Sequence, residues 1–96
     1  MYVVVHHRIK DPEARIRGLK LMKGEGAPAG TRALQFYPAS DNSKVTCLWE
    51  APSVVAVQTY VDETLGETSE NSCYEVDTAV AFARQPLGLR DTPAIA

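Results

Sequence analysis

The sequence predicts an α+β domain whose secondary structure runs strand, helix, strand, strand, helix, strand. Two observations support this fold class. Runs of β-branched and aromatic residues alternate with segments that repeat apolar residues at helical spacing, and each helical segment opens on a capping residue beside a proline. We assign residues 1–84 to one domain and residues 85–96, which contain Pro86, Gly88 and Pro93, to a C-terminal tail.

The composition is that of an ordinary globular domain. The 96 residues are 45% hydrophobic and 23% charged, with a formal net charge of −2. This charge argues against nucleic-acid binding, no apolar run is long enough to span a bilayer, and no signal-peptide pattern is present. We therefore expect a cytoplasmic protein without a nucleic-acid or membrane partner. Cys47 and Cys73 match no metal-binding spacing, so we expect two free thiols.

The first half of the chain supplies a strand, a helix and a loop. Residues 2–9 are rich in valine and free of glycine and proline, as is typical of a strand. Asp11 and Pro12 form a helix start, and apolar residues follow at helical spacing toward residue 23. Three glycines and a proline within residues 24–30 predict a loop.

The second half adds a hairpin, a helix and a last strand. Residues 31–39 and 44–50 have strand composition and are joined by a polar turn. Pro52 ends the third strand, Ser53 caps a helix over residues 53–65, and Gly66 ends that helix. Residues 69–77 are expected to form the fourth strand, and residues 78–84 a short helical turn.

This order of elements is the split βαβ pattern, which predicts a four-stranded antiparallel sheet in the order 4-1-3-2 with two helices on one face. Right-handed crossovers lead us to expect the first and third strands as neighbours that run in the same direction. Alternation along each strand assigns side chains to the two faces. The set expected under the helices is Val3, Val5, Leu34, Phe36, Val45, Cys47 and Trp49. The opposite set is Tyr2, Val4, His6, Arg8, Ala33, Gln35, Tyr37, Thr46, Leu48 and Glu50.

The face without helices is expected to expose more apolar area than a soluble monomer usually does. The main contributors are Tyr2, Val4, Tyr37 and Leu48. A second copy of the sheet, packed face to face about a two-fold axis, covers this area most simply. The sequence therefore predicts a homodimer that associates through the sheet.

The size and order of elements are similar to the dimeric α+β barrel superfamily, whose ferredoxin-like subunits pair to enclose a cavity. The segment CLWEAPSVVAV at residues 47–57 resembles small uncharacterised bacterial families that share a C-L-aromatic-E-A-P stretch. The resemblance implies a ferredoxin-like fold and a homodimer. Some relatives are reported to bind nickel, others to be monooxygenases or isomerases. Nickel-binding relatives carry histidines on the second helix, whereas residues 57–66 (VQTYVDETLG) contain none.

Polar residues on the face without helices are the candidate site. His6, Arg8 and Glu50 share this face by parity, and the expected parallel pairing places all three at one end of the sheet. A carboxylate beside a histidine orients the ring and stabilises its charged form, so His6 and Glu50 are catalytic candidates. The candidates for ligand binding are Arg8, Gln35, Tyr37 and Asn71. The alternative is that Arg8 and Glu50 simply pair, with His6 hydrogen-bonded at the dimer seam.

The leading functional hypothesis is binding of a small molecule in a cavity between the two sheets. One alternative is a cofactor-independent monooxygenase or isomerase with His6 as the general base, and another is nickel binding. A third is a structural role in which Leu48, Tyr2 and Tyr37 fill the space. We expect no cofactor and no metal site, because adjacent strand residues such as His6 and His7 point to opposite faces and cannot act as joint ligands.

Overall fold

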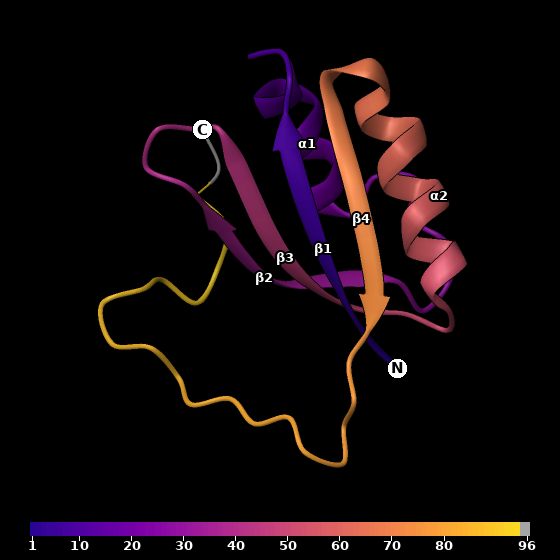
Figure 1. Cartoon of the computed structure of the whole chain (residues 1–96), viewed down its shortest axis with the longest axis vertical. Coiled ribbons are helices and arrows are strands. Elements are labelled where there is room, and N and C mark those ends of the chain that lie inside the picture. Colours follow the sequence, from indigo (N-terminus) through magenta and orange to yellow (C-terminus); the bar gives the residue numbers. More distant parts are fainter. Residues whose placement is uncertain (95–96) are drawn as a thin grey trace.

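The computed structural model describes residues 1–94 and contains one four-stranded sheet with two helices on the same side of it (Figure 1). The elements are β1 (Tyr2–Ile9), α1 (Ala14–Lys23), β2 (Arg32–Pro38), β3 (Lys44–Glu50), α2 (Val54–Leu65), the short 3-10 helix η1 (Gly66–Thr68) and β4 (Ser69–Glu75). The strands lie in the order β2-β3-β1-β4. The predicted α+β fold class, with its 4-1-3-2 strand order, is confirmed.

All neighbouring strands of the sheet are antiparallel, so the expectation that the first and third strands run in the same direction is wrong. The crossover through α1 makes β1 parallel to β2, which is its next-but-one neighbour. The β2–β3 hairpin then reverses the chain, and β3 consequently runs against β1. Tyr2 therefore pairs with Glu50, and Arg8 pairs with Lys44.

Local polar contacts fix the starts of both helices. Asp11 Oδ1 accepts the N–H of Glu13 at 2.8 Å in the turn that leads into α1, and Ser53 Oγ accepts the N–H of Ala56 at 3.0 Å at the start of α2. Gly24 ends α1 with a φ of 74°, a left-handed conformation that glycine adopts without a steric penalty. Ser53 and Gly24 thus act at the helix ends, whereas Asp11 organises the turn before α1.

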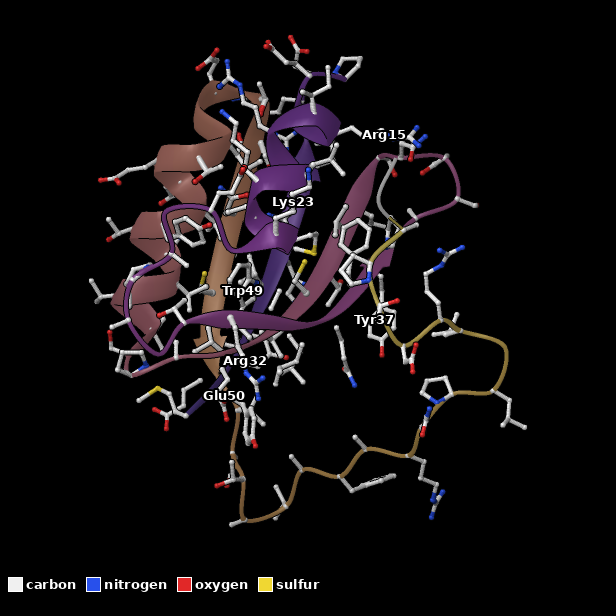
Figure 2. All side chains as sticks on the ribbon, turned by 180° about the vertical axis from the view of Figure 1, so that it is seen from behind. Arg15, Lys23, Arg32, Tyr37, Trp49 and Glu50 are labelled. Atoms are coloured by element: carbon white, nitrogen blue, oxygen red, sulfur yellow. The ribbon has the colours of Figure 1, made fainter. Side chains whose placement is uncertain are left out.

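The core lies between the sheet and the helices (Figure 2). Trp49 of β3 is completely buried, and its ring meets Tyr60 of α2 edge to face with centroids 5.9 Å apart. Burial of apolar area from both layers is the main stabilising contribution to the fold. The buried set comprises Val3, Val5, Leu21, Cys47, Trp49, Ala51, Val57, Tyr60, Val61 and Leu65.

A β-bulge in β2 changes which of its side chains face the helices. Ala33 pairs with Trp49 and Gln35 pairs with Leu48, so that Leu34 is the extra residue between them. Ala33 therefore packs against the core, where strict alternation placed Leu34. The bulge restores the predicted parity beyond Leu34, and Phe36 pairs with Cys47 on the helix side. Because β2 is an edge strand, Phe36 nevertheless remains 49% exposed.

The chain leaves the sheet after β4 and reaches residue 94 without a further helix or strand. Of the predicted short helical turn over residues 78–84, a single turn forms, in which the N–H of Ala81 donates to the carbonyl of Asp77 at 3.0 Å. Residues 95 and 96 of the predicted tail lie outside the described residues. Within residues 1–94, no helix has both the length and the apolar character needed to cross a membrane.

Candidate functional site

The sheet face opposite the helices is not covered by the chain's own helices, and we call it the open face (Figure 1). Strand pairing places its side chains in rows that run across the sheet. Two central rows are flanked by a charged row at each end. The open face consists of Tyr2, Val4, His6, Arg8, Arg32, Gln35, Tyr37, Lys44, Thr46, Leu48, Glu50, Glu70, Ser72 and Tyr74.

One central row is polar and contains the exposed histidine. Across the four strands, Tyr37 pairs with Thr46, Thr46 with His6, and His6 with Ser72. His6 Nδ1 and Thr46 Oγ1 share a hydrogen bond of 3.1 Å. Three hydroxyl groups and an imidazole thus stand side by side, each able to donate or accept a hydrogen bond.

The adjacent row is mostly apolar. It runs from Gln35 through Leu48 and Val4 to Tyr74. The Tyr74 ring also lies beside His6, with the ring centroids 6.0 Å apart and the planes tilted by 38°. The two central rows together form a floor with aromatic rings, aliphatic side chains and hydrogen-bonding groups, which is a composition typical of small-molecule sites.

A charged row with two cations and one carboxylate borders the two central rows at the C-terminal end of β1. Arg8 pairs in register with Lys44 on one side and Glu70 on the other. Arg8 Nη2 lies 2.7 Å from Glu70 Oε1, and Lys10 Nζ approaches the same carboxylate oxygen at 3.9 Å. The hydrogen bond from Arg8, followed by its charge, holds the pKa of the Glu70 carboxyl below its ordinary value.

A second charged row lies at the opposite end of the open face. Glu50 accepts a hydrogen bond of 3.1 Å from Arg32 Nε, and Figure 2 shows these two side chains together. Because Glu50 pairs in register with Tyr2, it stands at the far end of β1 from Arg8. The expected contact between His6 and Glu50 therefore does not form, and the physical reason is the antiparallel direction of β1 and β3.

An open hollow of about 540 Å³ lies at the Arg8 end. The residues that line it are His6, His7, Arg8, Lys44, Glu70, Asn71 and Ser72. Five of these residues, His6, Arg8, Lys44, Glu70 and Ser72, belong to the open face and bring two cations and one carboxylate beside two hydrogen-bonding groups. This hollow has the arrangement expected of a site for an anionic group.

Asn71 faces the helices, although it was predicted to join His6 and Arg8. Its Oδ1 is only an acceptor and lies 2.7 Å from His7 Nδ1, so that nitrogen carries the proton. Ser69 Oγ donates to the same oxygen at 2.7 Å, and Asn71 Nδ2 donates to Asp62 Oδ1 at 2.9 Å. Gln58 Nε2 also donates to the Asp62 carboxylate. We call these five side chains the buried polar network after His7 and Ser69, which are buried; Gln58 and Asn71 are half-buried, and Asp62 is exposed.

Burial, and not the polar network, favours the neutral form of His7. His7 is 5% exposed, and burial lowers its pKa below the ordinary value of 6.5. The hydrogen bond with Asn71 opposes this shift, the charge of His6 adds to it, and the charge of Asp62 opposes it. His7 therefore links β1 to β4 and α2. Strand alternation already separates His7 from His6. Its partner Asn71, and Asp62 beyond Asn71, are too distant in the sequence to be found by pattern.

The two thiols lie on the helix side of the sheet. Val5 pairs with Cys47 on one side and with Cys73 on the other, so β1 separates them. Both are free, as expected. Burial, followed by the neighbouring thiol, raises the pKa of Cys47 to about 12, and burial, followed by the Asp62 charge, raises that of Cys73 to about 11. Neither is a thiolate near neutral pH, which removes the nucleophilic form. Among residues 1–94, no three or more His, Cys, Asp or Glu side chains form a group that could hold a metal ion.

Of the predicted site residues, His6, Arg8, Gln35 and Tyr37 share the open face, and His6 and Arg8 line the hollow. Glu50 is on the same face at the other end, and Asn71 directs its side chain into the buried polar network. Sequence reasoning missed Lys44 in the hollow. The signal for it was available, because an antiparallel neighbour of β1 that begins at residue 44 must place its first residues beside the end of β1.

No protein-family model and no curated protein matches the chain. Solved structures with a similar fold include SCO4226 from Streptomyces coelicolor A3(2), with a TM-score of 0.53 and 24% identity over 80% of this chain and 96% of that one. Rv0793 from Mycobacterium tuberculosis has a TM-score of 0.50 and 16% identity over 81% of this chain and 97% of that one. At these identities the similarity establishes a shared α+β fold and does not extend to activity.

Proposed function

We propose that two copies of this chain pack through their open faces and bind a small organic anion in the space between the sheets. The apolar side chains of the open face support the pairing. Val4 and Leu48 are only half-buried in the single chain, and Tyr2, Tyr37 and Tyr74 are 40%, 39% and 51% exposed. A face-to-face dimer removes this area from water, and two-fold symmetry lets the same surface serve on both copies.

The main observation in favour of an anionic ligand is that Arg8 lies beside Lys44 in the hollow. Arg8 is neutralised by Glu70, whereas Lys44 has no carboxylate within salt-bridge distance among the described residues. Hydrogen bonds from Ser43, followed by the charge of Lys44, lower the pKa of the nearby Asp41 carboxyl, but Lys44 and Asp41 do not form a salt bridge. The two cations therefore share one ion-paired carboxylate, and they favour a ligand that supplies a second negative group. A carboxylate or phosphate group meets this requirement with charge-assisted hydrogen bonds.

The neighbouring rows suggest what the rest of the ligand looks like. Tyr37 offers an aromatic ring at one end of the polar row, and Tyr74 offers another beside His6 in the adjacent row. His6, Thr46 and Ser72 offer hydrogen bonds along the polar row. An aromatic or partly apolar molecule with one anionic group suits both the cationic end and this floor. Gln35, in the apolar row, adds a hydrogen-bonding group at the edge of the floor.

The alternative with His6 as the general base has weaker support. The carboxylate meant to orient the ring, Glu50, is ion-paired with Arg32 at the other end of the open face. The partner of His6 is instead the hydroxyl of Thr46, which orients the ring but carries no charge to stabilise the imidazolium form. Nickel binding is suggested by the resemblance alone.

Native mass spectrometry of the freshly purified full chain tests the pairing. We expect a dimer, and an additional mass on it would identify a ligand retained during purification. A monomer at all protein concentrations measured would overturn the dimer.

Titration calorimetry with benzoate and phenylphosphate as probes tests the ligand class. Lys44→Ala is expected to weaken binding by about tenfold, the loss expected for one charge-assisted hydrogen bond. Lys23→Ala is the matched control, because Lys23 is an exposed lysine at the end of α1, on the other side of the sheet (Figure 2). Equal affinities for the two variants, or no binding of either probe by the unaltered chain, would contradict the anion site.

A further inference from the structure

The chain leaves the sheet at a fixed point on the margin of the open face. After β4, the N–H of Val76 donates to the carbonyl of Tyr2 at 2.9 Å, which extends the pairing with β1 by one residue. Asp77 Oδ1 then accepts the N–H of Ala79 at 3.0 Å, and the Asp77 carbonyl accepts the N–H of Ala81. These bonds form a turn that redirects the chain at the Tyr2 end of the open face.

Residues 79–94, which we call the arm, expose large apolar side chains. Val80 is 76% exposed, Phe82 80%, Leu87 98% and Leu89 56%. The Arg84 guanidinium carbon lies 5.4 Å from the centroid of the Phe82 ring, and this is a contact within the arm itself. Within residues 82–94, no hydrogen bond joins the arm to the sheet or the helices. Figure 1 shows the arm in a wide loop outside both layers.

An isolated exposed leucine is ordinary, but four large apolar side chains in one segment without helix or strand are the pattern of a segment that packs against another surface. The chain's own core is already closed by α1 and α2. Sixteen extended residues reach up to roughly 55 Å. The whole described chain has principal extents of 36 × 32 × 20 Å, so the arm is long enough to cross a second molecule of the same size.

We propose that the arm of one protomer packs across the second copy of this chain. This inference rests on the proposed dimer, because the arm begins where the open face ends and therefore starts at the edge of the proposed interface. The body also offers exposed apolar side chains for the contact outside the open face, including Ile16, Leu34, Phe36 and Val55. Burying the arm there adds contact area to each protomer and makes the pairing reciprocal, as two-fold symmetry requires.

Sedimentation velocity over a range of protein concentrations tests the energetic part of the proposal. The full chain with Phe82→Ser, Leu87→Ser and Leu89→Ser is expected to dimerise at least about tenfold more weakly than the unaltered chain. The matched control replaces the polar arm residues Gln85→Ser and Thr92→Ser and is expected to dimerise normally. Unchanged dimerisation of the triple-serine variant would contradict the proposed packing of the arm on the second copy. It would leave the proposed sheet-to-sheet dimer in place. A monomeric unaltered chain would remove both.

Cross-linking tests where the arm packs. A photo-reactive phenylalanine analogue at position 87 is introduced into the full chain, and natural-abundance and ¹⁵N-labelled chains are mixed before illumination. Cross-linked peptides that join a light chain to a heavy chain are the expected result. Cross-links confined to single chains would show that the arm folds back on its own subunit, and would overturn the proposal even if dimerisation were weakened.

Discussion

The two faces of the sheet come from the same four strands, but only one of them is completed by the chain itself. On the helix side of β1, Val3, Val5 and His7 are 0%, 0% and 5% exposed. On the open face, their neighbours His6 and Arg8 are exposed. The helix side holds the core and the buried polar network, whereas the open face holds the hollow, two charged rows and unshielded aromatic rings.

The difference separates residues that stabilise the chain from residues that are available to a partner. His7 and His6 are adjacent in sequence, yet His7 is neutral and linked to Asn71, whereas His6 lies in a row of hydroxyl groups. A side chain with its hydrogen bonds filled inside the fold has little left for a ligand. Substitutions on the helix side should therefore lower the free energy of unfolding at every protein concentration. Substitutions on the open face should act through dimerisation or ligand binding.

The largest effect is expected for Trp49→Ala. Trp49 is completely buried, and loss of its ring is expected to reduce the free energy of unfolding by about 3–5 kcal/mol. Denaturant unfolding followed by circular dichroism measures it. Trp49→Phe keeps an aromatic ring and removes an indole N–H that is buried without a hydrogen-bond partner among the described residues, so its cost should stay below about 1.5 kcal/mol.

Leu48→Ala, one residue away on the open face, is the comparison for Trp49→Ala. Its cost is expected to grow with protein concentration, because a dimer that forms only from folded chains stabilises folding by mass action. If Leu48→Ala cost as much as Trp49→Ala at every concentration, the two faces would not differ in the way we describe.

A medium effect is expected for Asn71→Ala on β4. The substitution removes the acceptor shared by His7 and Ser69 and the donor to Asp62, and His7 is then left buried without its partner. An unsatisfied buried polar group costs about 1–3 kcal/mol. Ser72→Ala, the adjacent residue on the open face, should change stability by less than about 0.5 kcal/mol. Equal losses for the two variants would contradict the structural role of the network.

The pH dependence of stability separates the two histidines. Burial keeps the pKa of folded His7 below its ordinary value of 6.5, so the unfolded chain binds the proton first as the pH falls. The free energy of unfolding is therefore expected to fall as the pH drops through about 6.5 and to level off below the folded pKa. Asn71, Asp62 and His6 are the neighbouring groups that modulate this shift.

Unfolding curves of His7→Gln and His6→Gln between about pH 7.5 and 5.5 check this assignment. His7→Gln should flatten the dependence, and His6→Gln should largely keep it. The opposite pattern, with His6→Gln flattening the curve, would mean that the open-face histidine controls stability.

Short-range signals in the sequence predicted most of the architecture. Ser53 accepts the N–H of Ala56, Pro52 precedes α2, and the composition of residues 2–9 is sufficient for β1. These features act over a few residues, so a single sequence contains them. Parity along the strands likewise placed His6 and Tyr37 on the same face before the register was known.

Features that depend on how distant strands meet were not predictable in the same way. Parity assigns a face but not an end, so an error in the direction of β3 moved Glu50 to the wrong end while leaving its face correct. The bulge at Leu34 has no strong local signal and reverses the assignment of Ala33. Asn71 was predicted to lie near His6, but its side chain donates a hydrogen bond to Asp62 on α2.

The smallest effect is expected for Arg32→Ala, which compares the two ends of the open face. The Arg32–Glu50 pair is exposed, with the two side chains 71% and 41% accessible. Exposed pairs of this kind contribute about 0–1 kcal/mol and weaken with added salt. Stability should therefore change little in denaturant unfolding at low salt and less at high salt. Arg32→Ala should also leave the binding of benzoate unaffected, whereas Arg8→Ala should weaken it. The reason is that Arg8 lines the hollow and Arg32 does not. If Arg32→Ala weakened binding as much as Arg8→Ala, the ligand would span the whole open face rather than its Arg8 end.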